Sequence, residues 1–194
     1  MTKIKICGLF REQDIEYVNE AQPDYAGFIL HYPKSHRNVD PETAARLRKG
    51  LRPGIKAVGV FVDQPAETIL EAVWHANLDI IQLHGHESDA FIDAIREMTG
   101  LPVWKAFRIT DADDLLRARA CEADRVLLDN GYGSGVSFDW RLAGGFGRSY
   151  VLAGGLTPEN IPEAVRLLQP DVIDISSGVE TEKVKDREIG RAHV

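Results

Sequence analysis

Cys7 and Asp129 are the two residues whose type and position most directly suggest proton-transfer chemistry. Cys7 follows the strand-like run 4–6, and Asp129 follows the aliphatic run 126–128. A thiolate can accept a proton, and a partly desolvated carboxyl group can donate one. Because parallel strands in an α/β barrel end at the same face, the two side chains are candidates for a general acid–base pair.

The neighbours of Cys7 bear on its charge state. On strand alternation Cys7 shares a face with Lys5 and Lys3, and a nearby ammonium group favours thiolate over thiol. Gly8 gives the backbone freedom to turn directly after it. The alternative is a small buried hydrophobic residue, which is what a free cysteine usually is, and position alone does not decide between them.

Asp129 lies at the mouth of a hydrophobic strand, where partial desolvation suits a carboxyl group to general-acid work. The glycines in segment 130–135 predict a loop that can pass close to a substrate. The alternative is an aspartate that only starts a turn or caps the next segment.

Two glycine-containing turns follow the last two predicted strands. Gly154 and Gly155 lie in the first turn, and Ser177 and Gly178 lie in the second. Both turns expose backbone N–H groups at adjacent barrel positions, which predicts a phosphate site rather than two ordinary turns. Thr157 is expected to be the N-cap of the intervening helix.

Other polar residues give weaker signals. Arg37 follows the second predicted strand and could form a two-point contact with a carboxylate, although a solvated loop arginine fits the spacing equally well. Gln82 and His84 share a parity and could face the barrel axis. Trp74 and His75 lie in a helical stripe and are expected to be packing residues.

Metal chemistry is not expected at the pair of histidines after the fourth predicted strand. His84 and His86 are not accompanied by an Asp, Glu or Cys cluster with ligand spacing. The sequence therefore predicts no metal site.

Composition limits the classes of protein. The 194 residues are 44% hydrophobic and 27% charged, as expected for one compact domain spanning 1–194. The net charge of -7 and scattered basic residues argue against a nucleic-acid partner. With two cysteines and no signal-like or membrane-length apolar run, we expect a cytoplasmic protein without disulfides and without membrane association.

Short β-branched and aliphatic runs alternate with longer segments of helical character. Their starts are 21 to 31 residues apart, which is about one βαβ step each. The eight runs are 4–7, 25–30, 56–62, 80–83, 103–107, 125–128, 150–153 and 172–176. Eight such units without a long linker predict a single α/β domain, a closed (β/α)8 TIM barrel, with an open doubly wound sheet as the alternative.

The outer ring of helices is expected to be thin in places. Segments 111–120 and 141–147 are short for covering helices, and the second contains three glycines. Only 185–194 remains for a final helix.

The strand-end motifs together resemble those of the phosphoribosylanthranilate isomerase family of tryptophan biosynthesis. The resemblance covers nearly the whole chain, and the first, fourth and last motifs are the most specific. The motifs are Lys5-Ile6-Cys7-Gly8, Gly27-Phe28-Ile29 with Pro33-Lys34-Ser35 and Arg37, Gly59-Val60-Phe61, Gln82-Leu83-His84-Gly85, Leu128-Asp129, Phe138-Asp139-Trp140, Ala153-Gly154-Gly155-Leu156 and Ser176-Ser177-Gly178-Val179-Glu180.

The resemblance implies an enzyme that carries out a cofactor-free Amadori rearrangement. Its substrate would be N-(5-phosphoribosyl)anthranilate, and its product 1-(2-carboxyphenylamino)-1-deoxyribulose 5-phosphate. Asp129 would protonate the ring oxygen, and Cys7, as thiolate, would remove the proton from C2. The two roles need opposite protonation states at one pH.

The resemblance also implies how the substrate is held. Arg37 would bind the anthranilate carboxylate, His84 would line the pocket, and the loops at Gly154-Gly155 and Ser177-Gly178 would bind the phosphate. Segment 131–136 departs from the Gly-Gly-Thr-Gly pattern common in the family. The assembly is expected to be a monomer or a homodimer.

Two other classes of phosphosugar protein stay open. An indole-glycerol-phosphate synthase would need a catalytic lysine and glutamate, of which Lys105 could supply one, and a ribulose-phosphate epimerase would need a metal cluster. A non-catalytic phosphosugar-binding barrel would not need Cys7 and Asp129 together.

Overall fold

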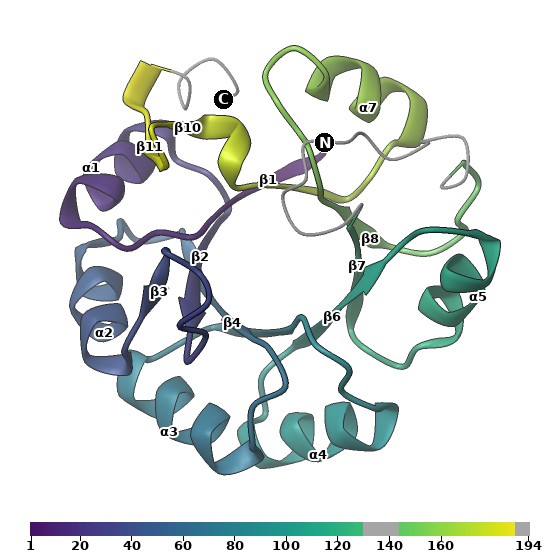
Figure 1. Cartoon of the computed structure of the whole chain (residues 1–194), viewed down its shortest axis with the longest axis horizontal. Helices are drawn as coiled ribbons and strands as arrows, with labels where there is room; N and C mark the ends of the chain where they lie inside the picture. The colour runs from purple at the N-terminus through teal and green to yellow at the C-terminus, as the bar shows by residue number, and fades with distance from the viewer. Residues whose placement is uncertain (130–143, 189–194) are drawn as a thin grey trace.

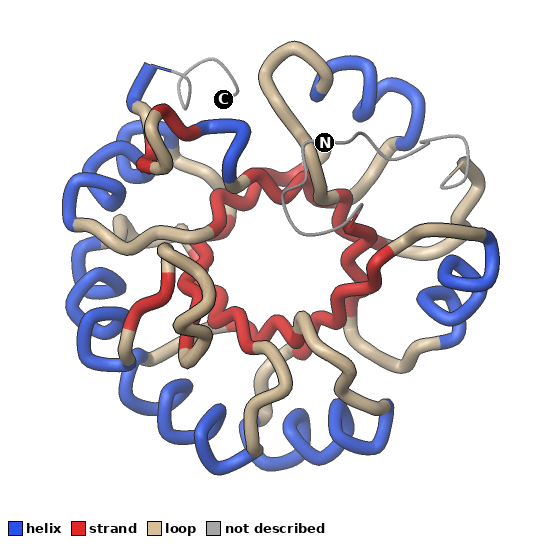
Figure 2. Tube along the Cα trace, in the orientation of Figure 1, coloured by secondary structure: helices blue, strands red, loops and turns tan. Residues whose placement is uncertain are grey.

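The computed structural model, which describes residues 1–129 and 144–188, forms a ring of parallel strands surrounded by helices (Figure 1). Figure 2 shows the strands as a closed inner circle and the helices outside it. The strands of the ring are β1 (Lys3–Cys7), β2 (Tyr25–Leu30), β4 (Lys56–Phe61), β5 (Ile80–Leu83), β6 (Val103–Arg108), β7 (Arg125–Asp129), β8 (Tyr150–Leu152) and β9 (Val172–Ile175).

Strand β1 closes the barrel by pairing on both sides. Lys5 is in register with Tyr25 of β2 and with Asp174 of β9, and every pairing around the ring is parallel. The predicted barrel is therefore confirmed, and the open sheet is wrong. All eight predicted strands are present with bounds within one residue of those expected.

The helices lie between successive strands on the outside of the ring. They are α1 (Glu12–Ala21), α2 (Pro41–Gly50), α3 (Ala66–Ala76), α4 (Asp89–Thr99), α5 (Ala112–Ala120) and α7 (Ile161–Leu168). Their ends carry local signals: Ser88 caps α4 by accepting from the Phe91 N–H at 3.3 Å, and Gly100 ends it in the left-handed region with φ 67°. The predicted shortness of α5 is confirmed at nine residues.

An apolar cluster fills the barrel interior and sets the depth of the site. It contains Ile80, Leu127 and Val172 together with Tyr25 and Trp104, which meet edge to face at 5.1 Å. Strand side chains alternate between the two faces, so the residues two positions further along these strands also face inward. Those positions are Gln82, Asp129 and Asp174. An apolar base therefore supports a polar layer at the carboxyl ends of the strands.

Two short strand pairings were not predicted. Strand β3 (Asn38–Val39) pairs in parallel with the end of β2, and β10 (Glu180–Thr181) pairs antiparallel with β11 (Val184–Lys185) after the 3-10 turn η1 (Ser177–Val179). Lys185, expected in a final helix, lies in β11, and only Arg187 and Glu188 are helical among the described residues after it. Figure 1 places the β10–β11 hairpin beside α1.

Three smaller expectations are wrong. Thr157 is not the N-cap of α7. The Asn160 side chain accepts a hydrogen bond from the Thr157 N–H at 2.8 Å in a turn, and the helix begins only at Ile161. Trp74 and His75 are exposed rather than packed, Trp74 to 63%, since they lie on the outer side of α3. Predictions for 130–143 lie outside the described residues.

Candidate active site

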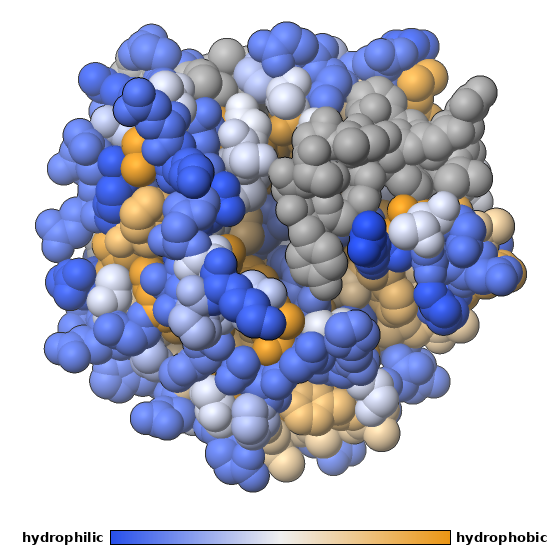
Figure 3. Space-filling view, in the orientation of Figure 1, coloured by the Kyte–Doolittle hydropathy of each residue, from blue (hydrophilic) through white to orange (hydrophobic). Residues whose placement is uncertain are grey.

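A cavity of about 450 Å³ opens at the carboxyl ends of the strands. The structure brings all eight predicted site residues to its wall. They are Cys7, Arg37, His84, Asp129, Gly154, Gly155, Ser177 and Gly178. Figure 3 views this face of the molecule, where hydrophilic residues predominate at the visible surface.

Cys7 ends β1 inside the barrel and is 7% exposed. Gly8 follows in the left-handed region, with φ 79°, and turns the chain away. Burial raises the pKa of the Cys7 thiol, and the ammonium of Lys5 opposes that rise without cancelling it. The expected ammonium is thus present, but in the free protein it does not lower the pKa of Cys7 below its ordinary value.

Lys5 and Asp174 form a buried ion pair beneath Cys7. Lys5 Nζ lies 2.8 Å from Asp174 Oδ2, and Lys5 is fully buried. Burial alone would lower the pKa of Lys5, but the charges of Asp174 and Cys7 raise it above its ordinary value. Lys5 therefore stays protonated and places a positive charge at the base of the site. The sequence predicted Lys5 beside Cys7, but not the pairing of Lys5 with Asp174.

Two side chains of and just after β5, Gln82 and His84, form a chain of hydrogen bonds that ends at Asp129. His84 Nε2 lies 3.2 Å from Asp129 Oδ2, and Gln82 Nε2 lies 3.1 Å from His84 Nδ1. With Gln82 donating to Nδ1, the hydrogen of a neutral imidazole is on Nε2 and is donated to Asp129. The expectation that Gln82 and His84 face the barrel axis agrees with their common place at the cavity wall.

The two glycine turns after β8 and β9 pack directly against each other. A Cβ at Gly178 would overlap the carbonyl oxygen of Leu156, so no other residue fits without moving one loop. Gly154 and Gly155 have φ of 85° and 63°, and neither donates its N–H to another described residue. Asn160 Nδ2 holds the carbonyl of Gly155 at 2.8 Å. The turns thus leave the N–H groups of Gly154 and Gly155 unbonded within the described residues, at positions on the cavity wall.

Arg37 is bound by a carboxylate of the protein itself. Its Nε lies 2.7 Å from Glu180 Oε1 and its Nη2 lies 2.6 Å from Oε2. Lys185 Nζ reaches the same Oε1 at 2.6 Å. Burial would raise the pKa of Glu180, but hydrogen bonds and charge from Arg37 and Lys185 lower it, so Glu180 is ionised. Arg37 thus makes its two-point contact with Glu180 of the protein itself, and its predicted contact with a substrate carboxylate stays a prediction.

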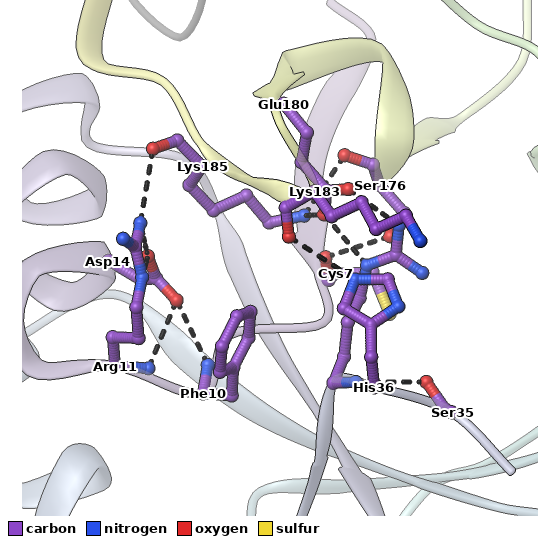
Figure 4. Close-up of polar contacts among 11 residues, drawn as sticks. Cys7, Phe10, Arg11, Asp14, Ser35, His36, Ser176, Glu180, Lys183 and Lys185 are labelled. Atoms are coloured by element: carbon purple, nitrogen blue, oxygen red, sulfur yellow. Dashed lines mark hydrogen bonds and ion pairs between the residues drawn. The ribbon is translucent and has the colours of Figure 1, made fainter.

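The Glu180 cluster is connected to the strand that carries Cys7 (Figure 4). Lys185 Nζ donates to the Ser176 carbonyl at 3.0 Å, and Ser176 Oγ donates to the Cys7 carbonyl at 3.1 Å. Arg11, at the start of α1, donates from Nη2 to the Lys185 carbonyl at 3.2 Å. The hairpin thus joins the Arg37 side of the cavity to the Cys7 side.

Lys105 does not face this cavity. Its ammonium donates to the carbonyls of Gly85 and Ala106 at 2.7 and 3.0 Å and pairs with Glu87 at 3.2 Å, beside a neighbouring cavity. The Lys105 ammonium is therefore bound by groups of the protein itself and is not placed as a catalytic lysine in the main cavity. This argues against the synthase alternative. Among residues 1–129 and 144–188, no group of three His, Cys, Asp or Glu side chains is arranged to hold a metal ion.

Comparison with known proteins agrees with this geometry. The family model described as N-(5'phosphoribosyl)anthranilate (PRA) isomerase matches residues 4–194. This chain belongs to that family. The resemblance drawn from the strand-end motifs is confirmed.

Relatives in the phosphoribosylanthranilate isomerase family match along almost the full chain. The isomerase of Thermoanaerobacter sp. (strain X514) is 44% identical over 193 residues, covering 96% of this chain and 93% of the relative. A crystal structure of a family member in complex with reduced 1-(o-carboxyphenylamino)-1-deoxyribulose 5-phosphate has a TM-score of 0.89 at 35% identity, covering 99% of this chain and 96% of the other.

A second solved structure concerns monomers made from the dimeric family member of Thermotoga maritima. It has a TM-score of 0.88 at 36% identity and covers 99% of this chain and 96% of the other. In the part of this chain that is described, no helix combines the length and apolar character that crossing a membrane requires.

Proposed function

We propose that this chain isomerises N-(5-phosphoribosyl)anthranilate to 1-(2-carboxyphenylamino)-1-deoxyribulose 5-phosphate by general acid–base catalysis. One observation carries the proposal: a single cavity has a thiol, a carboxyl group, a guanidinium and two backbone N–H turns on its wall. These groups match the reacting centre, the carboxylate and the phosphate of that substrate. The family of the chain supports the same activity.

Asp129 and Cys7 divide the proton transfers. Asp129 donates a proton to the ring oxygen, and the ring opens to a protonated Schiff base between C1 and the anthranilate nitrogen. Cys7, as thiolate, then takes the proton on C2, whose electrons move into the C1–C2 bond to give an enolamine. Tautomerisation of the enolamine yields the ketone. His84 supports the first step, because its bond to Asp129 Oδ2 orients the carboxyl group.

Cys7 needs help to act as a base. Burial raises the pKa of the thiol, so the neutral form dominates in the free protein at neutral pH. Lys5 lies beside the sulfur and favours the thiolate. The protonated Schiff base adds a second positive charge next to Cys7 at the moment its proton must leave.

Arg37 binds the anthranilate carboxylate with the part of its guanidinium that Glu180 leaves free. Glu180 occupies Nε and one hydrogen of Nη2. The two hydrogens of Nη1 and the other hydrogen of Nη2 remain for a carboxylate that approaches end-on. His84 lines the pocket for the sugar.

The phosphate is held by the turns at Gly154-Gly155 and Ser177-Gly178. No side-chain charge lies in either turn, so binding depends on backbone N–H groups and on the close packing at Gly178. We further propose that the chain acts without cofactor in the cytoplasm, as a monomer or homodimer, with a phosphosugar and not a nucleic acid as its partner.

Loss of anthranilate-type fluorescence tests the activity. Purified protein mixed with freshly made phosphoribosylanthranilate should remove the fluorescence at a rate proportional to enzyme concentration, and mass spectrometry should find a product of unchanged mass. Cys121→Ser is the matched control, because it alters the buried cysteine outside the cavity and should keep full activity. Unchanged fluorescence with folded protein would overturn the proposal.

A further inference from the structure

Asp174 is a buried carboxylate whose two oxygens are used unequally. Oδ2 accepts from Lys5 Nζ at 2.8 Å. Oδ1 is buried and has no hydrogen-bond partner among the described residues. The residue is 8% exposed, and its partner Lys5 is fully buried. One oxygen is therefore fixed by the fold, and the other is unsatisfied.

An ionised carboxylate oxygen without a donor is costly in a buried position. Oδ2 is already bound to the ammonium of Lys5 at 2.8 Å in a carboxylate–ammonium ion pair. Oδ1 can then only accept hydrogen bonds. The structure thus requires a donor that the described part of the chain does not supply.

Asp174 lies on the wall of the main cavity, next to Cys7. A Cβ placed on Gly27 would lie 2.8 Å from Cys7 Sγ and 3.2 Å from Lys5 Nζ, so the thiol and the ammonium meet over the same backbone position. The Asp174 carboxylate is bonded to that ammonium. A group that donates to Oδ1 therefore sits beside the atom on which Cys7 acts.

We propose that Asp174 is a substrate-binding residue whose Oδ1 accepts a hydrogen bond from the hydroxyl group on C2 of the sugar. This inference rests on the proposed function, in which Cys7 removes the hydrogen of that same carbon. The bond directs the C2 hydroxyl toward β9 and the C2 hydrogen toward Cys7. Asp174 then selects for sugars that carry a hydroxyl at C2.

Binding of two ligands tests this role without turnover. The first is the reduced product, 1-(2-carboxyphenylamino)-1-deoxypentitol 5-phosphate, and the second is the same molecule without its C2 oxygen. Removing the oxygen should weaken binding to the unmodified protein about 10- to 100-fold, the range for a hydrogen bond to a charged group. Calorimetry gives both dissociation constants.

Three variants locate the effect. Asp174→Asn keeps the shape and removes the charge, so the penalty for losing the C2 oxygen should shrink. Lys5→Met/Asp174→Leu removes both buried charges, a change that folds often tolerate, and should reduce the penalty to about threefold or less. Asp79→Asn, at a carboxylate that pairs with Arg48 and lies outside the cavity, should keep the full penalty.

The outcomes separate this inference from the proposed function. Equal penalties in the unmodified protein and in both Asp174 variants would overturn the role of Asp174, while tight binding of the reduced product would leave the isomerase proposal standing. If the reduced product without its C3 oxygen, used as a third ligand, shows the Asp174-dependent penalty and the molecule without its C2 oxygen does not, the assignment to C2 is overturned. Failure of the unmodified protein to bind the reduced product would overturn both.

Discussion

Glu180 binds Arg37 through both carboxylate oxygens, at 2.7 and 2.6 Å, across 143 residues of sequence. Lys185 completes the cluster from the opposite strand of the β10–β11 hairpin. Glu180 therefore fixes the direction in which Arg37 presents its remaining N–H groups to the cavity. Glu180, which was not among the predicted site residues, thus orients Arg37, which was.

Replacing Glu180 by glutamine should loosen this orientation. In Glu180→Gln the charge that pairs Arg37 and Lys185 is lost, so Arg37 no longer has one fixed position and binding of the substrate carboxylate weakens. We expect KM to rise roughly tenfold with kcat changed less than about threefold, measured by steady-state fluorescence. Glu20→Gln, which breaks an exposed two-point pair with Arg187, is the control and should leave KM unchanged. A fall in kcat at constant KM would contradict the orienting role.

Cys7 and Asp129 should be separable from binding. Cys7→Ala and Asp129→Asn each remove a proton-transfer group, and we expect kcat to fall about 10²- to 10⁴-fold. The dissociation constant of the reduced product should change less than about threefold, because neither substitution alters the phosphate turns or Arg37. Either variant with near-full activity would remove that residue from the mechanism.

The pH dependence should report the thiol. The pKa of Cys7 is raised by burial, so the thiolate fraction and kcat/KM increase as pH rises toward that value, above the range of an ordinary thiol. Lys5 lowers this pKa more than Asp174 raises it, so removing both charges should raise it further.

The test compares pH profiles of kcat/KM for the unmodified protein and Lys5→Met/Asp174→Leu. The rising limb should move to higher pH in the double variant. Cys121→Ser should leave the limb in place, since that thiol lies outside the cavity. A limb that moves to lower pH in the double variant would show that Lys5 does not stabilise the thiolate.

The barrel could be predicted because its strands are apolar runs at regular spacing. Residues such as Ile80 and Val172 belong to short apolar segments that need burial on both faces, a local signal that survives folding. The two-residue strands β3 and β10 carry no such signal, since they exist through pairing with β2 and β11. Trp74 shows the converse, because an aromatic residue in a helical stripe is still exposed when smaller residues form the inner face of α3.

The site could be predicted as a set of residues, but not as a network of contacts. Cys7 and Asp129 were found because strand ends meet at one face of a barrel. Which residues they contact depends on register between strands far apart in sequence: Lys5 lies opposite Asp174, and Arg37 meets Glu180, only because β1 closes the barrel against β9. The net effect of burial and charge on the pKa of Cys7 required this geometry.

The packing of the phosphate turns gives the last prediction. In Gly178→Ala the new methyl group would overlap the Leu156 carbonyl, and relief requires the turn after β8 to move away from the turn after β9. The two turns would then no longer keep their present spacing, and we expect binding of inorganic phosphate, measured by calorimetry, to weaken at least about tenfold. Gly100→Ala, which places a side chain at positive φ with open space around it, is the control for backbone strain, because it should lower stability by about 1 kcal/mol and leave phosphate binding unchanged. Unchanged phosphate affinity in a folded Gly178→Ala protein would show that the anion binds elsewhere on the barrel mouth.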